Sequence, residues 1–237
     1  MLVAGAVAGA PCTQVFGSAK IFADDTPIPV LDPGRGRTKT GRLWVYTRDD
    51  RPWGGPDPPA AVYFYSPDRK AERPASHLEA FRGVLQVDGY AGFERLTERG
   101  EIVLAACWAH TRRKFFDVHE ATGSPIADKA LRRIAELYVI ERSIRGRAAE
   151  ERRSVRDSRS RPLVEAMKPW LEAQLGRIPG RSGLADAIRY TLSRWPALCH
   201  FLDDGRIELD NNSVERAIRP VAMTESFCTP YSSIWKH

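Results

Sequence analysis

Apolar residues in the first half of the chain are spaced as in β-strands. Runs rich in Val, Ile, Tyr, Trp and Phe alternate with clusters of Gly and Pro. A basic stretch at 32–42, with Arg35, Arg37, Lys39 and Arg42, is predicted to be a hairpin loop. The first three strands are expected to be antiparallel. The pattern predicts strands at 20–30, 41–50, 60–69, 84–90 and 101–107, and a short helix at 75–83.

The second half of the chain changes to helical spacing. Ser124 and Pro125 are a plausible cap and first residue of a helix. The apolar residues that follow recur every three or four positions as far as Ile144. Further helices are predicted at 150–175, where Pro162 and Pro169 interrupt the pattern, and at 182–202. Together these segments predict a long helical block after a sheet.

Net charge and cysteine spacing indicate which kind of partner and which redox compartment to expect. The chain of 237 residues has a formal net charge of +6 and a pI near 9.3. This charge favours a polyanionic partner such as nucleic acid, although a solvated Arg-rich surface would produce the same balance. The four scattered cysteines form no disulfide-like framework, which indicates a reducing cytosol. No apolar run is long enough to cross a membrane, and residues 1–14 are expected to form a poorly packed tail.

Three acidic residues are candidates for a catalytic site. Asp24 ends the first predicted strand, Asp88 ends the fourth, and Glu215 follows the helical block. If a fold brings their carboxylates together, they can bind two Mg²⁺ ions about 3.5–4 Å apart and act on phosphodiesters. Each residue also has a purely structural interpretation. The two aspartates occur in turn-forming sequences, and Glu215 can close a capping box opened by Asn212.

Several long motifs occur in order and carry a resemblance to a known family. They are FADDTPIPVL, GVLQVDGYAGF, AACWAHTRRKFFDVH, DAIRYTLSRW and LDNNSVERAIRPVA. With these motifs the chain resembles the transposases of bacterial insertion sequence 66 from about Val15 to about Thr224. The resemblance implies an α/β ribonuclease-H-like fold, a mixed sheet with a helical insertion between the fifth strand and the helix that bears the glutamate.

The resemblance also implies a division of the chain. Residues 1–118 would form the first part of the catalytic domain, and 119–205 the helical insertion. Residues 206–224 would contain the catalytic helix, and 225–237 a divergent tail.

Carried over residue by residue, the catalytic and metal-binding carboxylates of the family fall on Asp24, Asp88 and Glu215. Asp25 is the alternative first ligand, and Asp49 is a weaker rival. By analogy the protein would be a DDE transposase that uses two Mg²⁺ ions, with Mn²⁺ as a substitute. It would cut the 3′ ends of its element and join them to target DNA.

The implied partners are transposon ends and target DNA, with self-association or accessory transposition proteins and no membrane. The implied location is the bacterial cytoplasm, in association with the nucleoid. Five cations are candidates for phosphate contacts: Arg112, Arg113, Lys114, Arg216 and Arg219.

Other residues leave alternatives open. Cys107 and His110 are half of a zinc motif with no obvious second half, and a buried cysteine beside a polar histidine at a strand exit is the favoured explanation. Trp53 in a Gly/Pro loop is a candidate for base stacking. Both ends depart from the family pattern, so we expect a truncated copy unable to transpose alone. An inactive remnant that binds DNA or another transposase, and a simple metal-dependent nuclease, are the alternative functions.

Overall fold

The structure is a computed structural model that describes residues 10–32, 34 and 36–223. Its five strands form one mixed sheet in the order β3-β2-β1-β4-β5. The first three strands are antiparallel neighbours, whereas β1, β4 and β5 run parallel. The strands are β1 (Lys20–Asp32), β2 (Arg37–Arg48), β3 (Ala60–Ser66), β4 (Gly83–Val87) and β5 (Ile102–Ala106).

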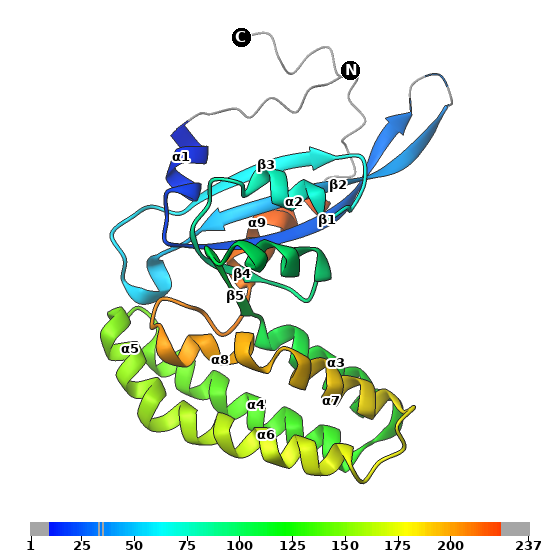
Figure 1. Ribbon diagram of the computed structural model, residues 1–237, viewed down its shortest axis with the longest axis vertical. Coiled ribbons are helices and arrows are strands. Elements are labelled where there is room, and N and C mark those ends of the chain that lie inside the picture. The colour runs from blue at the N-terminus through cyan, green and yellow to red at the C-terminus, as the bar shows by residue number, and fades with distance from the viewer. Residues whose placement is uncertain (1–9, 33, 35, 224–237) are drawn as a thin grey trace.

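The helices of the described residues fall into two groups. Short helices lie around the sheet, and α3 to α8 form a separate layered block beside it (Figure 1). The predicted α/β fold is confirmed, and this arrangement is consistent with a ribonuclease-H-like architecture. The α-helices are α1 (Ala10–Phe16), α2 (Glu72–His77), α3 (Trp108–Thr122), α4 (Pro125–Ile144), α5 (Ala149–Val155), α6 (Arg161–Leu175), α7 (Gly183–Ser193), α8 (Trp195–Asp203) and α9 (Asn212–Met223). Two 3₁₀ segments, Arg51–Trp53 and Ala91–Arg99, and one π-helical segment, Arg156–Ser160, complete the list.

The two faces of the sheet have different coverings. One face packs Trp44 and Tyr46 into an apolar cluster with Val15 of α1 and Phe93. On the other face, α9 buries Val214 against strands β1 and β2. A third and larger cluster joins β5 to the helical block. The alternation of side chains along β1 therefore decides which residues face α9.

The first two strands extend beyond their neighbours. β1 pairs with β2 as far as Asp32 and Arg37, but β4 pairs with β1 only up to Ala23. The outer part of β1 and β2 consequently projects as a two-stranded ribbon (Figure 1). Much of the stretch predicted as a hairpin loop is thus strand, because the antiparallel ladder continues through the Thr- and Arg-rich residues.

Several predicted boundaries also differ from the structure. Residues 10–16 form α1, although a tail without regular structure was expected as far as residue 14. The apolar side of this helix packs on the sheet, where Val15 is fully buried. The helix predicted at 182–202 divides at Arg194, since Pro196 begins a new helix there. Among the described residues, no helix combines the length and apolar character needed to span a membrane.

Candidate active site

The parallel pairing of β1 with β4 brings Asp24 and Asp88 side by side, although β1 does not end at Asp24 as predicted but continues to Asp32, because its antiparallel pairing with β2 goes on. Ala23 of β1 pairs with Val87 of β4, and each aspartate is the next residue along its strand direction. Both carboxylates therefore lie where β4 ends and β1 continues with β2 alone, a region called the acidic edge below. The register of β1 against β4 is therefore sufficient to explain why Asp24 and Asp88 are neighbours.

Glu215 reaches the same region from α9. Phe22 and Val45 lie on the sheet face that packs against Val214, the residue before Glu215. Asp24 is two residues after Phe22 and shares its face of β1. Glu215 lies in the first turn of α9, and its charge acts on Asp24. All three predicted carboxylates therefore belong to one region of the molecule.

The electrostatics of this region are unfavourable for a charged Asp24. Burial of the side chain raises the pKa of Asp24 to about 7, and the negative charges of Asp88 and Glu215 act in the same direction. One oxygen of Asp24 accepts a hydrogen bond from the backbone N–H of Asp25, at 2.7 Å. Within the described residues no cation forms an ion pair with Asp24. A cation bound here would compensate that charge.

Asp88 combines a turn with an open carboxylate. Its Oδ1 accepts a hydrogen bond from the backbone N–H of Tyr90 at 3.0 Å, which is the turn geometry that Asp-Gly favours. Its Oδ2 lies 3.9 Å from Arg69, and the side chain is 16% exposed. Asp88 therefore stabilises a turn, as its structural interpretation predicted, and its carboxylate also lies beside Asp24 at the acidic edge.

Asp25 lies on the opposite face of β1 and is fully engaged. Arg69 donates to both of its carboxylate oxygens at 2.8–3.0 Å, and Arg42 donates to one at 2.9 Å. The Asp25 side chain is 0% exposed. Its role in this arrangement is an internal ion pair that fixes the loop after β3, which leaves Asp24 as the aspartate facing α9.

Asp49 likewise has partners that occupy its carboxylate. Arg51 donates two hydrogen bonds of 2.8 Å, and Ser213 of α9 donates one of 3.2 Å. Burial alone would raise the pKa of Asp49, but the hydrogen bonds and charge of Arg51 lower it. Arg216 also approaches Asp49, at 3.4 Å. Asp49 therefore anchors the start of α9, and Arg216 is partly committed to that contact.

The loop before α9 is tied to the two strands that carry the aspartates. The side-chain amide of Asn211 donates to the carbonyl of Ala23 at 3.0 Å. The amide of Gln86 donates to the carbonyls of Glu208 and Asp210 at 2.7 and 2.9 Å. These bonds link each strand, one or two residues before its aspartate, to the segment that presents Glu215.

The asparagines do not cap α9 through their side chains. Asn211 bonds to β1, and the Asn212 side chain donates to Asp210 at 2.5 Å. The capping box considered for Asn212 and Glu215 is consequently absent from the described hydrogen bonds. The sequence has the spacing of a capping box, but the Asn212 amide bonds to the carboxylate of Asp210 and the Asn211 amide bonds to the buried carbonyl of Ala23.

The described residues contain no group of three His, Cys, Asp or Glu side chains arranged to hold a metal ion. The expected convergence into a three-ligand group is therefore not met, although oxygen donors at the acidic edge have the chemistry that Mg²⁺ prefers. Cys107 is buried, and that burial raises the pKa of its thiol to about 12. This environment disfavours the thiolate that zinc requires, so Cys107 and His110 are better explained as structural residues.

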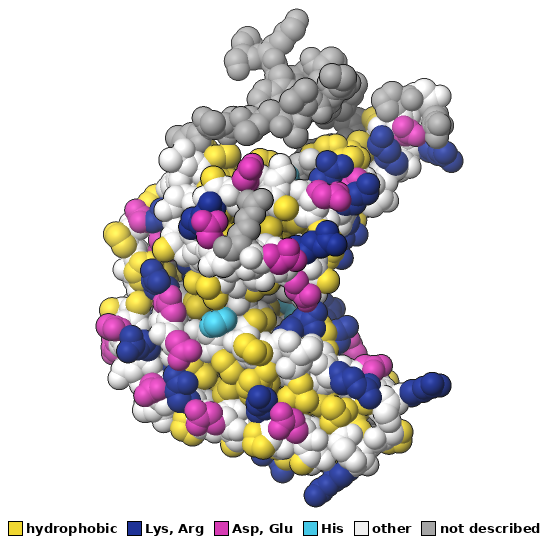
Figure 2. Space-filling model, in the orientation of Figure 1, with side chains coloured by type: hydrophobic (Ala, Val, Ile, Leu, Met, Phe, Trp, Pro, Cys, Tyr) yellow, Lys and Arg dark blue, Asp and Glu magenta, His cyan; other side chains and the backbone are white. Residues whose placement is uncertain are grey.

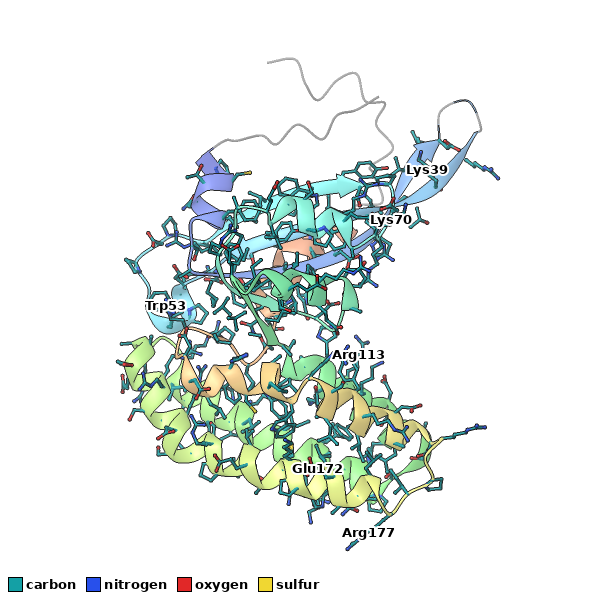
Figure 3. All side chains as sticks on the ribbon, viewed as in Figure 1. Lys39, Trp53, Lys70, Arg113, Glu172 and Arg177 are labelled. Carbon is teal, nitrogen blue, oxygen red and sulfur yellow. The ribbon has the colours of Figure 1, made fainter. Side chains whose placement is uncertain are left out.

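Three predicted DNA contacts lie together on α3. Arg112, Arg113 and Lys114 are exposed, and no ion pair involving them occurs in the described part of the chain. Figure 3 labels Arg113 on α3, close to the junction between the helical block and the sheet. Figure 2 shows Lys and Arg side chains gathered at the hollow between these two parts. Arg219 is exposed on α9.

Trp53 lies far from this hollow. Figure 3 labels Trp53 at the opposite edge of the molecule from Arg113. Its loop packs against the end of α4, where the backbone N–H of Gly146 donates to Pro52 at 2.7 Å. The position fits a structural role better than base stacking in the site.

The sequence analysis missed two residues that lie near the three carboxylates, Asp210 and Arg69. Asp210 is near enough for Glu215 to help raise its pKa, although burial is the larger cause. Arg69 joins Asp25 to the neighbourhood of Asp88 from the loop after β3. Asp210 could have been found from the sequence, because it stands in the LDNN motif just before Glu215. No local pattern distinguished Arg69, because its partner is 44 residues away in the chain.

Comparisons with known proteins agree with the resemblance. A family model described as the Transposase IS66 family matches residues 10–234. The chain is 48% identical to the uncharacterized protein y4jD of Sinorhizobium fredii over 211 residues, 86% of this chain and 41% of that protein. It is 44% identical to protein y4qI of the same organism over 218 residues, 89% of this chain and 40% of that protein. The chain thus spans about two fifths of the length of these relatives. No solved structure matches it.

Proposed function

The chain belongs to the IS66 family of transposases, and on that premise we propose that it carries a metal-dependent centre for DNA strand cleavage and strand transfer. Asp24, Asp88 and Glu215 are its catalytic carboxylates. The observation that carries this proposal is the partly buried Asp24, whose charge the two other acids oppose and with which no described cation forms an ion pair. Such a group is costly to a folded protein unless it has a function.

Each carboxylate has a defined part in the proposed centre. Asp24 and Asp88 supply oxygen ligands for Mg²⁺ or Mn²⁺ from the neighbouring strands β1 and β4, and Glu215 supplies a third from α9. When bound, the metal lowers the pKa of the attacking oxygen and neutralises charge on the phosphate. The strands and the ties at Gln86 and Asn211 hold the ligands in place, and such positioning is a large part of the rate.

The cations of α3 supply binding to DNA in this proposal. Arg112, Arg113 and Lys114 contact backbone phosphates and bring the substrate to the acidic edge without reading its sequence. Arg219 adds a contact from α9. Arg216 contributes less, because Asp49 competes for its guanidinium.

A second candidate function is DNA binding without cleavage. The absence of a three-ligand metal group from the described residues favours it, while the exposed cations of α3 are retained. This chain spans only about two fifths of the length of its relatives. The proposal therefore concerns the centre in this chain and does not extend to the activity of a whole transposase.

Incubation of the purified protein with labelled linear DNA and Mg²⁺ or Mn²⁺ separates these functions. We expect cleavage that Asp88→Asn abolishes and that Glu120→Gln, an exposed acid on α3, leaves unchanged. Joined products indicate strand transfer, and cleavage without them indicates a simple nuclease. Retardation of the DNA with no cleavage under either metal would overturn the catalytic proposal and support the binding function.

A further inference from the structure

Helix α7 of the helical block is docked on the turn that follows Asp88. A Cβ atom at Gly89 would lie 2.3 Å from the hydroxyl oxygen of Tyr190, so any other residue there would displace the Tyr190 side chain. Arg194, the residue that ends α7, donates to the carbonyl of Gly89 at 3.2 Å. The acidic edge of the sheet therefore has a wall that comes from another part of the chain.

Two cations lie against Tyr190 at this wall. The guanidinium carbon of Arg194 is 4.1 Å from the centre of the Tyr190 ring, and the Lys114 ammonium of α3 is 5.6 Å from it. Cations over an aromatic face are held without losing their charge. The Tyr190 side chain thus fixes two positive groups next to the turn of Asp88.

The charges of these cations are not neutralised by carboxylates. Arg194 donates only to carbonyls and a hydroxyl, and neither it nor Lys114 forms an ion pair among residues 10–32, 34 and 36–223. Arg189, on the same helix, is different because it pairs with Asp186 at 3.0 Å. Arg194 and Lys114, unlike Arg69 near Asp88, are therefore available to bind an anion.

The neighbouring hollow limits which anion fits. A cavity of about 400 Å³ between α3 and α7 is lined by Lys114 and Tyr190, and also by Asp117 and Asp186. These carboxylates repel a second anionic group. The arrangement suits a single phosphate in a strand that passes over Tyr190, rather than a polyphosphate ligand held in the cavity.

We propose that Arg194 and Lys114 bind the DNA backbone phosphate adjoining the one that is cut at Asp88. The helical block then belongs to the substrate site, through α7 as well as α3. This inference rests on the proposed function, since it takes the acidic edge as the place where DNA reacts. Arg194 connects phosphate binding to the catalytic carboxylates, because its guanidinium also bonds to the turn that follows Asp88.

The salt dependence of DNA binding tests this contact. Fluorescence anisotropy of a labelled linear duplex, without divalent metal, gives the affinity as a function of salt concentration. We expect Arg194→Gln and Lys114→Gln together to lower the slope of log affinity against log salt by about 0.9, the value for one lost phosphate contact, and each alone to lower it by part of that amount. Arg189→Gln is the matched control and is expected to leave the slope unchanged.

A purely structural role of Arg194 gives a different result. In that case Arg194→Gln weakens binding without changing the slope, and Arg194→Lys does not restore it. If Arg194→Gln fails to fold by circular dichroism, Lys114→Gln decides the matter, because Lys114 is exposed on another helix. Unchanged slopes in the folded variants would overturn the inference.

This outcome is separable from failure of the proposed function. Asp88→Asn tests cleavage and leaves both cations in place. Cleavage that persists in Asp88→Asn overturns the catalytic proposal and removes the basis of this inference with it. Abolished cleavage together with unchanged slopes for Arg194→Gln and Lys114→Gln rejects the phosphate contact alone.

Discussion

At the scale of single residues, Asp24 is a charge without a compensating partner. Its carboxylate is partly buried near Asp88 and Glu215, and no described cation pairs with it. Because Asn removes the repulsion between these carboxylates, we predict that Asp24→Asn raises the stability of the metal-free protein by about 0.5–2 kcal/mol, the usual size of a stabilising substitution. Urea unfolding in the presence of a chelator at pH 8 measures it. The same variant is expected to lose cleavage, and a lower stability would contradict the proposed repulsion.

His77 is a second residue whose charge state is fixed by its surroundings. It stacks on Phe64 at a centroid distance of 4.4 Å and bonds to the Tyr46 hydroxyl at 2.9 Å. Burial, helped by the charge of Arg73, lowers the pKa of His77 to about 4. The ring therefore stays neutral in the folded protein at pH values where the unfolded chain is protonated.

This difference predicts a pH dependence of stability. Between pH about 6.5 and 4 the unfolded chain binds a proton at His77 that the folded chain does not, so stability falls as pH falls. The contribution is at most about 1.4 kcal/mol per pH unit. We expect His77→Phe to reduce the slope in this window and to leave the slope between pH 7 and 8 unchanged. Equal slopes for the two proteins from pH 6.5 to 4 would show that His77 is not the group responsible.

At the scale of elements, the position of α9 depends on polar ties as well as apolar packing. Val214 packs under the helix, while Asn211 and Ser213 bond to the sheet and to Asp49. The Tyr63 hydroxyl donates to the carbonyl of Ala217 at 3.1 Å. Loss of one tie leaves the helix folded but displaces its first turn.

We predict that Asn211→Ala lowers the cleavage rate by roughly a hundredfold, because a misplacement of about 1 Å at a catalytic group has this effect. The unpaired Ala23 carbonyl should also destabilise the fold by about 1–3 kcal/mol. Asn212→Ala, at the exposed neighbouring position, is the control. A cleavage rate for Asn211→Ala within threefold of the unsubstituted protein would show that the tie does not position Glu215.

The five strands and the antiparallel arrangement of the first three were predictable, but the contacts that place the site residues were not. Apolar runs gave the five strands, since buried strands need such residues wherever they pair. The choice between Asp24 and Asp25 could not be made from the sequence, because it depends on Arg69 and on which face α9 covers. The length of the ribbon was missed for the same reason, as polar strand residues follow the register of a partner strand.

At the scale of the whole molecule, buried ionic groups join the helical block to the sheet. Lys20 of β1 is 2% exposed and donates to the carbonyl of Arg206 at 2.9 Å. Arg152 of α5 lies 2.6 Å from Glu208, whose backbone bonds to Gln86 of β4. Arg152 lies in a stretch rich in Arg and Glu, residues 150–161, a composition typical of a solvated face. The burial of Lys20 and Arg152 follows from the packing of two parts of the chain, which no local pattern contains.

The centre of this network is Glu141 of α4, and its removal tests the whole arrangement. Arg156 donates to both of its carboxylate oxygens at 2.7 Å, and Arg152 donates at 3.1 Å. Arg152 and Arg156 are 1% and 0% exposed. Among the described residues, Glu141→Gln leaves the buried Arg156 without a carboxylate partner and leaves Arg152 with Glu208 alone. We predict a loss of about 3–5 kcal/mol in the free energy of unfolding, the usual result of breaking a buried ion pair from one side.

Calorimetry and urea unfolding measure this loss, with Glu136→Gln as the control, because Glu136 is exposed on the same helix. We expect a single transition in both variants, since Lys20 and Glu208 connect the helical block to the sheet through the same network. Two separate transitions in Glu141→Gln would show that the sheet keeps its stability when the block loses its own. In that case the helical block could open without the sheet, and Arg194 would leave the turn of Asp88 at the same time.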